Sequence, residues 1–494
     1  MKTYEEINQK IAKGEAVILT AEEMIKFVES NGLETAAKEV DVVTTGTFGA
    51  MCSSGAFFNF GHSDPPIKME HLWLNDVHAY HGNAAVDCYL GVTRMASPRN
   101  FEYGGGHVIE DLLAGKSVQL RATAYGTDCY PRTKLDMNFT LEDLNQAIML
   151  NPRNGYQRYI CATNTSDKTL YTYMGKLLPY LGNATYSGAG CLSPLQKDPT
   201  FRTIGIGTHI FLCGGDGYII GPGTQHDPTK GLGTLMVIGD MKTMNSRYFK
   251  GASFKGYGTT AFIGIGVPIP ILDIEMAKAT ARTDEEIKTN VEDYSTGRRN
   301  RPKLREITYA ELKSGKIEIM GKEVRVSSIS SLKMAREIAN TLKDKILKNQ
   351  FEITKPVKTL STDMICKPMK VHDVLLVSQQ MRLAVTVQVE SNIKDVANLI
   401  IEKATDHIVV VDEKQKLMGF LTTFDITKAV AKGCDTIKQI MIPKSKVHTV
   451  FMNDPIDIAI KKMKEYGISS LPVIDKDFHV KGLITAEDIV VGGD

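Results

Sequence analysis

The sequence predicts a mixed α/β (α+β) protein, with a large glycine-rich catalytic body followed by two copies of one small unit. In the body, short apolar runs alternate with Gly, Ser and Thr over residues 40–272, which is typical of short strands joined by tight turns. Near the C-terminus, "HIVVVDEKQKLMGFLTTFDITKAV" (407–430) matches "SLPVIDKDFHVKGLITAEDIVVGG" (470–493), which indicates a duplicated supersecondary unit. A chain of 494 residues is long enough for two or three domains. We expect a body at 1–354, a linker at 355–385 and repeat units at 386–432 and 440–494.

The N-terminal residues 1–40 predict two amphipathic helices. Thr3 can cap the first helix, and Glu6 stands at the spacing of a capping box. The same pattern begins again at Thr20, and Asn-Gly at 31–32 is a helix stop.

Residues 273–350 are strongly charged and predict surface helices around a short hairpin at 316–326. The helical segments include "EEIKTNVEDY" (285–294) and "SLKMAREIANTLKDKILKNQ" (331–350). Residues 355–370 look like an extended connection. In each repeat unit, an amphipathic helix precedes a strand, a turn, a second strand and a helix.

Composition excludes several classes of protein. The formal net charge of +2 gives no reason to expect nucleic acid or a membrane surface as a partner. The charged N-terminus does not resemble a signal peptide, and no apolar run is long enough to span a membrane, so we expect a cytoplasmic protein. The 8 cysteines are widely spaced and contain no Cys-x-x-Cys pair, which predicts reduced thiols without a zinc ribbon or a self-contained iron–sulfur cluster.

Two cysteines have distinctive surroundings. Cys52 lies in "GTFGAMCSSGAFFNFG" and precedes a Ser-Ser-Gly turn, which can direct backbone N–H groups at a thiolate. Cys129 lies in "AYGTDCYPRT", with Arg132 after it and Arg121 before it. A nearby arginine lowers the pKa of a thiol, whereas the neighbouring Asp128 raises it unless its side chain points away. The alternative for each is a small apolar residue beneath a loop.

Histidines are concentrated between these two cysteines. They show no His-Glu-x-x-His or other standard metal-ligand spacing, so we expect acid–base or hydrogen-bonding roles rather than a metal site. The five histidines are His62, His71, His78, His81 and His107.

The C-terminal repeat resembles a pair of CBS domains. Its hallmark, Gly-h-h-Thr-x-x-Asp with h apolar, begins once at Gly419 and again at Gly482. The resemblance implies a module that binds an adenosyl ligand such as S-adenosylmethionine or AMP, with threonine facing phosphate or ribose and aspartate accepting from the ribose hydroxyls. The alternative is that these side chains only cap the following helices. The residues concerned are Thr422, Asp425, Thr485 and Asp488.

The whole chain resembles the homocysteine biosynthesis proteins, the L-aspartate semialdehyde sulfurtransferases of anaerobic prokaryotes. The resemblance is carried by "TTGTFGAMCSSGAFFNFGH" (44–62), by "YGGGHVIEDLLAGKSVQLRATAYGTDCYPR" (103–132) and by the C-terminal CBS pair. It implies a transferase of methionine biosynthesis that makes homocysteine from aspartate semialdehyde and sulfide with an external reductant. It further implies a persulfide or related thiol intermediate, with Cys129 as the principal sulfur carrier and Cys52 as the second thiol.

This chemistry needs helper residues that the sequence does not assign. A general acid must protonate the departing oxygen, and His62, His107 or Tyr130 can do so. The substrate carboxylate suits a planar guanidinium, and Arg132 or Arg121 can supply one.

The resemblance also implies partners. We expect no cofactor in the catalytic body, a small ferredoxin-like electron donor and a homodimer. S-adenosylmethionine at the CBS pair would then act as a feedback signal.

Two other functions remain open. Inosine monophosphate dehydrogenase also combines CBS domains with a catalytic cysteine, but there the pair is inserted within a barrel, and this sequence shows no eightfold βα repeat. The second is a non-enzymatic regulatory protein that senses an adenosine-bearing ligand.

Overall fold

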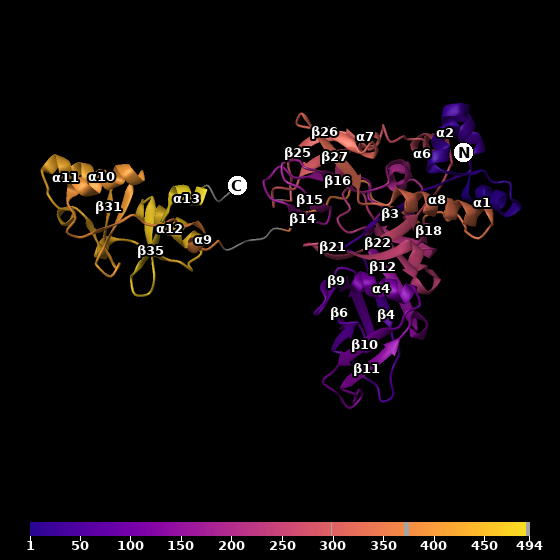
Figure 1. Ribbon diagram of the computed structural model, residues 1–494, viewed down its shortest axis with the longest axis horizontal. Coiled ribbons are helices and arrows are strands. Elements are labelled where there is room, and N and C mark those ends of the chain that lie inside the picture. The colour runs from indigo at the N-terminus through magenta and orange to yellow at the C-terminus, as the bar shows by residue number, and fades with distance from the viewer. Residues whose placement is uncertain (298, 370–374, 491–494) are drawn as a thin grey trace. The chain divides into compact units, whose positions relative to one another are not determined.

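The computed structural model describes residues 1–297, 299–369 and 375–490, and the chain forms two compact units (Figure 1). The units are Met1–Lys367 and Pro368–Asp494. The predicted class is confirmed, because the first unit is mixed α/β and the second contains the duplicated element. The segment expected to be a linker is divided between the units. Strand β28 (Lys358–Thr359) pairs with β17 (Gly205–Ile206), whereas the Val377 N–H donates to Asp454 O.

Three helices, rather than the expected two, open the chain: α1 (Tyr4–Lys13), α2 (Ala21–Asn31) and α3 (Leu33–Glu39). Both capping boxes form as the sequence predicts. Gly32 ends α2 with φ 82°, and the same residue occupies the N-cap position of α3. A left-handed glycine therefore redirects the chain into a further helix instead of ending the helical region.

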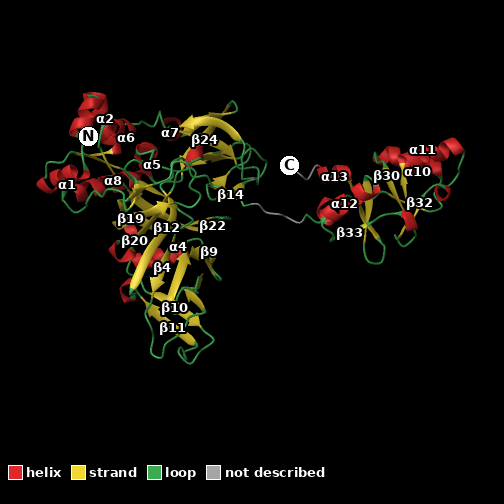
Figure 2. Cartoon of the chain, turned by 180° about the vertical axis from the view of Figure 1, so that it is seen from behind, coloured by secondary structure: helices red, strands yellow, loops and turns green. Residues whose placement is uncertain are grey.

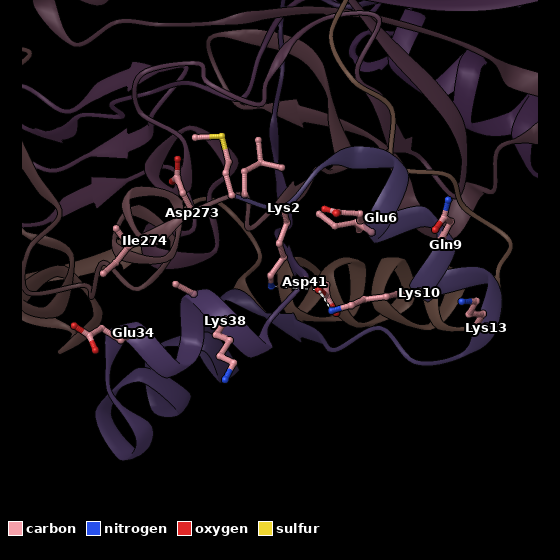
Figure 3. Close-up of a pocket in the computed structure, with 14 residues that line it drawn as sticks. Lys2, Glu6, Gln9, Lys10, Lys13, Glu34, Lys38, Asp41, Asp273 and Ile274 are labelled. Atoms are coloured by element: carbon pink, nitrogen blue, oxygen red, sulfur yellow. Dashed lines mark hydrogen bonds and ion pairs between the residues drawn. The ribbon is translucent and has the colours of Figure 1, made fainter.

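The buried Asp41 connects these helices (Figure 3). Its carboxylate accepts from Lys10 Nζ at 2.8 Å and from the Val17 N–H at 3.0 Å, and Lys2 Nζ lies 3.2 Å away. A cavity of about 780 Å³ lies against this group, between α1, α3 and the start of α6 (Ile274–Thr280). None of the predicted site residues lines it.

A nine-stranded sheet forms the centre of the first unit (Figure 2). Its pairings are all antiparallel, and β4 lies between β12 and β7. The turn from β3 to β4 contains Cys52. The strands, in sheet order, are β21 (Phe249–Phe254), β22 (Gly258–Gly266), β18 (His209–Leu212), β19 (Gly215–Pro222), β20 (Leu235–Asp240), β12 (Gln146–Asn154), β4 (Gly55–Asn59) and β7 (Asp87–Gly91), with β3 (Thr47–Ala50) paired to β22.

A six-stranded antiparallel sheet follows, and helix α4 (Gly105–Leu113) connects its β9 to β10 while packing on β21 and β22. The hairpin of β10 and β11 has Cys129 in its loop. The strands, in sheet order, are β11 (Lys134–Phe139), β10 (Val118–Thr123), β5 (His71–Leu74), β6 (Val77–Ala79), β8 (Met95–Ala96) and β9 (Asn100–Gly104).

A third, mixed sheet corrects one prediction. The segment 285–294 was expected to be helical, but it contains strand β24. Thr289, Val291 and Asp293 are buried while their neighbours are less so, and this period of two is that of a strand. The predicted hairpin and the long helix α8 (Leu332–Leu347) are confirmed. The strands, in sheet order, are β25 (Lys303–Thr308), β24 (Lys288–Asp293), β13 (Cys161–Thr163), β16 (Ala184–Tyr186), β27 (Lys322–Ser328) and β26 (Lys316–Ile319).

Smaller elements complete the first unit. A three-stranded sheet lies beside the N-terminal helices, and a short hairpin carries Tyr173 in its turn. The sheet consists of β1 (Ile18–Thr20), β2 (Val42–Thr44) and β23 (Pro268–Pro270), and the hairpin of β14 (Leu170–Thr172) and β15 (Gly175–Leu177). Two short helices, α5 (Pro194–Lys197) and α7 (Tyr309–Lys313), complete the unit.

The second unit has two sheets of the predicted repeat pattern, each with a parallel strand added to an antiparallel pair. The first repeat contains β29 (Thr386–Gln388), α10 (Ile393–Lys403), β30 (His407–Val411), β31 (Leu417–Thr422), α11 (Thr423–Lys432) and β32 (Ile442–Pro443). The second contains α9 (Val377–Gln380), β33 (Val450–Phe451), α12 (Ile456–Tyr466), β34 (Ser470–Ile474), β35 (Val480–Thr485) and α13 (Ala486–Val490).

Candidate active site

Cys52 lies where β3 turns toward β4, and its thiol is half-buried among hydroxyl groups. Strand β3 pairs with β22 in antiparallel orientation, and the pairing extends one residue beyond β3, where the Met51 N–H donates to Ala261 O at 2.8 Å. This pairing places Thr260 next to the thiol, and Thr260 Oγ1 donates to Cys52 Sγ at 3.2 Å. The Tyr257 hydroxyl lies 4.0 Å from the same sulfur. Hydroxyl donors of this kind stabilise a thiolate over a thiol.

Tyrosines extend from Cys52 toward the third sheet. The Tyr257 and Tyr173 rings are 6.0 Å apart, and the hydroxyls of Tyr173 and Tyr294 are hydrogen-bonded at 2.7 Å. Burial, and then the Cys52 thiol, raise the pKa of Tyr257 well above its usual value. Burial also raises the pKa of Tyr294 well above its usual value. Both phenols therefore remain protonated near neutral pH and can donate hydrogen bonds or a proton.

Three arginines accompany the tyrosines. The guanidinium of Arg301 lies 3.9 Å from the centre of the Tyr294 ring. Burial raises the pKa of Glu292, whereas Arg301 and Arg158 lower it, so this carboxyl group lies near both cations. Burial likewise raises the pKa of Tyr156, and the nearby Arg153 opposes the rise. Among the described residues, the Nε atoms of all three arginines are buried without a hydrogen-bond partner.

Further buried polar groups surround the Cys52 turn and the end of β12. The register that pairs Leu150 with Gly55 brings Asn151 beside Ser54. Asn151 and Asn154 are fully buried, and Ser54 is 2 % exposed. Within the described part of the chain, the amide nitrogens of both asparagines and the Ser54 hydroxyl have no hydrogen-bond partner. Buried polar atoms are almost always paired, so unpaired ones in one region favour a bound polar ligand.

Cys129 has a different environment, in the exposed loop that joins β10 to β11. The loop is closed by reciprocal backbone hydrogen bonds between Thr127 and Tyr130, both of 3.0 Å. The ring of His62 lies 6.0 Å from that of Tyr130. Arg132 is bonded to backbone carbonyls, through Nε to Pro65 O at 2.9 Å and through Nη2 to Asp64 O at 2.7 Å. A cavity of about 500 Å³ adjoins the loop, and its lining includes Glu70, His81, Tyr125 and Tyr130.

The structure does not bring the two predicted cysteines together. Cys52 precedes β4, whereas the loop of Cys129 packs on residues 62–66, which follow β4. At about 3.3 Å per residue, the two ends of strand β4 lie roughly 13 Å apart. A disulfide requires Cβ atoms about 3.8 Å apart, so the two thiols do not form one within this arrangement.

Four of the other cysteines are buried, and Cys191 among them lies near Lys313 and Asp284. Burial raises the pKa of Cys161 and Cys213 to about 12 and that of Cys191 to about 11, and it raises that of Cys88 further. These four side chains therefore remain neutral thiols in the core.

Of the five predicted helper residues, the structure places His62, Tyr130 and Arg132 with Cys129 and the other two elsewhere. Arg121 forms an ion pair with Asp76 at 2.6 Å. His107 accepts from the Gly104 N–H at 3.1 Å, and burial lowers its pKa.

The other histidines of this region form a loose group in which ring centres are 5.3 to 6.5 Å apart. They are His71, His78 and His81. Among the described residues, the one group with metal-ligand geometry lies instead in the second unit, at Asp475, Asp477 and His479.

The second unit shows helix capping at both hallmark motifs. Asp425 Oδ2 accepts from the Thr422 N–H at 2.9 Å, and Thr422 Oγ1 accepts from the Asp425 N–H at 3.4 Å. Asp488 Oδ2 accepts from the Thr485 N–H at 2.8 Å, and Thr485 Oγ1 accepts from the Asp488 N–H at 3.3 Å. The capping interpretation is therefore confirmed, and it does not exclude a ligand. A cavity of about 260 Å³ opens beside Thr422, and its lining includes His407, Phe420, Lys446 and Ser470.

Sequence reasoning missed the residues that surround Cys52. A signal for some of them was present, because "NPRNGYQRY" (151–159) places arginines and amides directly after the apolar "AIML" (147–150). Polar clusters at strand ends are frequent binding sites. Tyr257 and Thr260 carried no such signal, since only the pairing of β3 with β22 places them beside Cys52.

Comparison with known protein families gives two matches. Residues 16–353 match the family described as "Homocysteine biosynthesis enzyme, sulfur-incorporation". Residues 373–432 and 437–491 each match the CBS domain.

Similar proteins cover nearly the entire chain. A protein of Methanosarcina acetivorans named L-aspartate semialdehyde sulfurtransferase is 51% identical over 491 residues, which are 99% of this chain and 98% of that protein. A protein of Methanocaldococcus jannaschii with the same name is 49% identical over 504 residues, with the same coverage of 99% and 98%.

A solved structure is similar to the second unit alone. It is a CBS domain pair in complex with 5′-methylthioadenosine and S-adenosyl-L-methionine, 34% identical, covering 24% of this chain and 100% of that one with a TM-score of 0.23. In the described part of the chain, no helix is both long enough and apolar enough to cross a membrane.

Proposed function

Because this chain belongs to the homocysteine biosynthesis family of sulfur-incorporation enzymes and ends in two CBS domains, we propose that it forms L-homocysteine from L-aspartate semialdehyde, sulfide and an external reductant. The observation that carries the proposal is the 51% identity over 99% of the chain to a protein named for this activity. The polar surroundings of Cys52 support it independently, since they supply what an aldehyde–thiol reaction requires.

The reaction converts an aldehyde into a thiol. The aldehyde, one H₂S, two protons and two electrons give the thiol and one water. Sulfur must therefore reach the carbonyl carbon, oxygen must leave as water, and an electron donor must supply one pair of electrons. No Cys-x-x-Cys motif stands in the chain, so we assign the electrons to a ferredoxin-like partner protein.

We assign the reaction at the aldehyde to Cys52. Its thiolate adds to the carbonyl carbon, and Tyr257 donates a proton to the oxygen, forming a thiohemiacetal. Protonation then releases that oxygen as water while HS⁻ adds to the same carbon. Two electrons and a proton finally cleave the bond between this carbon and the Cys52 sulfur, which returns the thiolate and leaves the product thiol. The contacts of Thr260 and Tyr257 with the sulfur support this role.

We assign sulfur carriage to Cys129. Its exposure permits a protein persulfide that donates sulfane sulfur to reach it: the Cys129 thiolate takes the donor's outer sulfur, becomes a persulfide and releases the donor's thiolate, whereas free sulfide reaches Cys52 without this step. A second pair of electrons from the same external donor, with one proton, splits the persulfide anion into the Cys129 thiolate and HS⁻. The released HS⁻ then serves at Cys52, which accounts for two thiols held apart. His62, Tyr130 and Arg132 remain candidates for proton transfer and anion binding at this loop.

The test of the function is the complete reaction. The purified full-length chain, supplied with L-aspartate semialdehyde, sulfide and a low-potential reductant under anaerobic conditions, is expected to form homocysteine, measured by mass spectrometry after thiol alkylation. Omitting the aldehyde, the sulfide or the reductant in turn should abolish the product. Hydride transfer from inosine monophosphate to NAD, without homocysteine formation, would instead favour the dehydrogenase alternative.

We further propose that the CBS pair binds an adenosyl ligand beside Thr422, as a regulatory site for S-adenosylmethionine. The cavity lined by Thr422 and Lys446 supports this, since a hydroxyl and an ammonium suit ribose or a charged group. Asp425, Thr485 and Asp488 are the further candidates from the repeat motifs, and dimerisation through the pair remains a prediction.

Calorimetric titration with S-adenosyl-L-methionine and with AMP measures this binding. The full-length chain is expected to release or absorb heat with at least one of them, and Thr422→Ala is expected to weaken that binding about 10-fold by removing a hydrogen bond. Thr308→Ala is the control, because Thr308 caps α7 of the first unit through a capping box with Glu311, as Thr422 caps α11 through one with Asp425. Absence of heat with both ligands would leave the pair only a role in dimerisation.

A further inference from the structure

We propose that Arg153 binds the carboxylate of the aldehyde substrate beside Cys52, and this inference rests on the proposed function. Arg153 is on β12, which lies next to β4 in the nine-stranded sheet. The Cys52 turn leads directly into β4. The pairing of these two strands therefore brings the last residues of β12 to the Cys52 turn, although the residues are far apart in the sequence.

The surroundings of Arg153 place it in the same group as the thiol. Tyr156 and Tyr257 are near both Arg153 and Cys52: burial is the main cause that raises the pKa of each phenol, Cys52 adds to the rise and Arg153 opposes it. The Tyr257 hydroxyl is 4.0 Å from the Cys52 sulfur. The cation of Arg153, the phenols of Tyr156 and Tyr257 and the Cys52 thiol thus form one group, in which Tyr257 is exposed and the other three are half-buried.

Arg153 also has unused hydrogen-bonding capacity. Its Nε is buried without a partner, its guanidinium is hydrogen-bonded to the Tyr156 phenol, and none of the ion pairs among the described residues includes Arg153. The buried amide nitrogens of Asn151 and Asn154 lie on the same strand and lack hydrogen-bond partners within the described residues as well. A guanidinium presents parallel N–H donors that match the two oxygens of a carboxylate, so a substrate carboxylate satisfies the arginine and neutralises its charge.

The arginines suggested by the sequence are differently placed. Arg121 is already paired with Asp76, and the donors of Arg132 are used by two backbone carbonyls. Aspartate semialdehyde is short, so its carboxylate and its aldehyde carbon must be recognised close together. Arg153 meets that requirement at Cys52, and the ligand class is a small amino acid with a free carboxylate and a reactive carbonyl.

The experiment compares two aldehydes on three proteins. The wild type is expected to use L-aspartate semialdehyde far better than 3-aminopropanal, which lacks the carboxylate. Arg153→Gln is expected to lower kcat/KM for L-aspartate semialdehyde about 100-fold, mainly through KM, because one charge-assisted pair is lost. The same change should leave kcat/KM for 3-aminopropanal nearly unaltered. Arg121→Gln is the matched control and should behave as the wild type with both aldehydes.

Equal losses with the two aldehydes, or an unchanged KM for L-aspartate semialdehyde, would overturn the assignment of Arg153. The proposed function fails separately, if the wild type forms no homocysteine at all. Calorimetric titration with L-homoserine, a stable analogue with an alcohol in place of the aldehyde, then tests the site alone. Binding by the wild type that is lost in Arg153→Gln supports the carboxylate site, and equal heats from both proteins contradict it.

Discussion

Replacing Cys52 by alanine is expected to lower homocysteine formation by at least about 1000-fold, because the variant lacks the nucleophile assigned to the aldehyde carbon. The loss should be the same at low and at high sulfide, since sulfide supply does not replace the covalent step. The rate is measured as homocysteine formed from L-aspartate semialdehyde under anaerobic conditions.

Cys366→Ala is the control for this substitution, because Cys366 is also a half-buried free thiol of the first unit and its sulfur has no catalytic neighbour among the described residues. A Cys52→Ala protein that retains more than a tenth of the wild-type rate would contradict the assignment. Thermal unfolding of the variant, monitored by circular dichroism, separates a chemical loss from a folding defect.

Replacing Cys129 by alanine is expected to have an effect that depends on the sulfur source. With a sulfane sulfur donor as the only source of sulfur, the rate should fall about 100-fold or more, because the exposed carrier thiol is missing. At high free sulfide, part of the rate should return, since HS⁻ then reaches the Cys52 site without a carrier. Mass spectrometry of the wild type after exposure to the sulfur donor should show one added sulfur atom on the peptide that contains Cys129.

An unchanged rate of Cys129→Ala with the sulfane donor as the only source of sulfur would remove Cys129 from the reaction. A rate that is lost at every sulfide concentration would instead show that Cys129 takes part at the aldehyde carbon as well. Either result is informative because the two thiols are measured under the same conditions, in variants that differ by one sulfur atom each.

The sequence predicted those features that depend on neighbouring residues. The capping boxes at Thr3 and Thr20 are local patterns of a few residues, and both form. The C-terminal repeat is visible by comparison of the sequence with itself, and both copies match the CBS domain. Cys52 was singled out by its Ser-Ser-Gly turn.

What the sequence did not predict depends on strand pairing. Arg153 and Thr260 are brought to Cys52 by two different strands, β12 and β22, and no local pattern specifies which strands become neighbours. Strand β24 was mistaken for a helix because its charged residues masked the alternation of Thr289 and Val291. The arginine-rich part of the site thus became visible only with the sheets assembled.

The position of β4 between the two thiols has a consequence for exposure to oxygen. Two thiols within bonding distance are protected from irreversible oxidation, because they form a disulfide that a reductant can cleave again. Cys52 precedes β4, whereas the loop of Cys129 packs on residues that follow β4, so these two thiols do not protect each other in this way. Each oxidised thiol can proceed to sulfinic and sulfonic acid unless another molecule intervenes, and this damage is irreversible in the absence of a dedicated repair enzyme. The separation of the two thiols therefore favours conditions without oxygen.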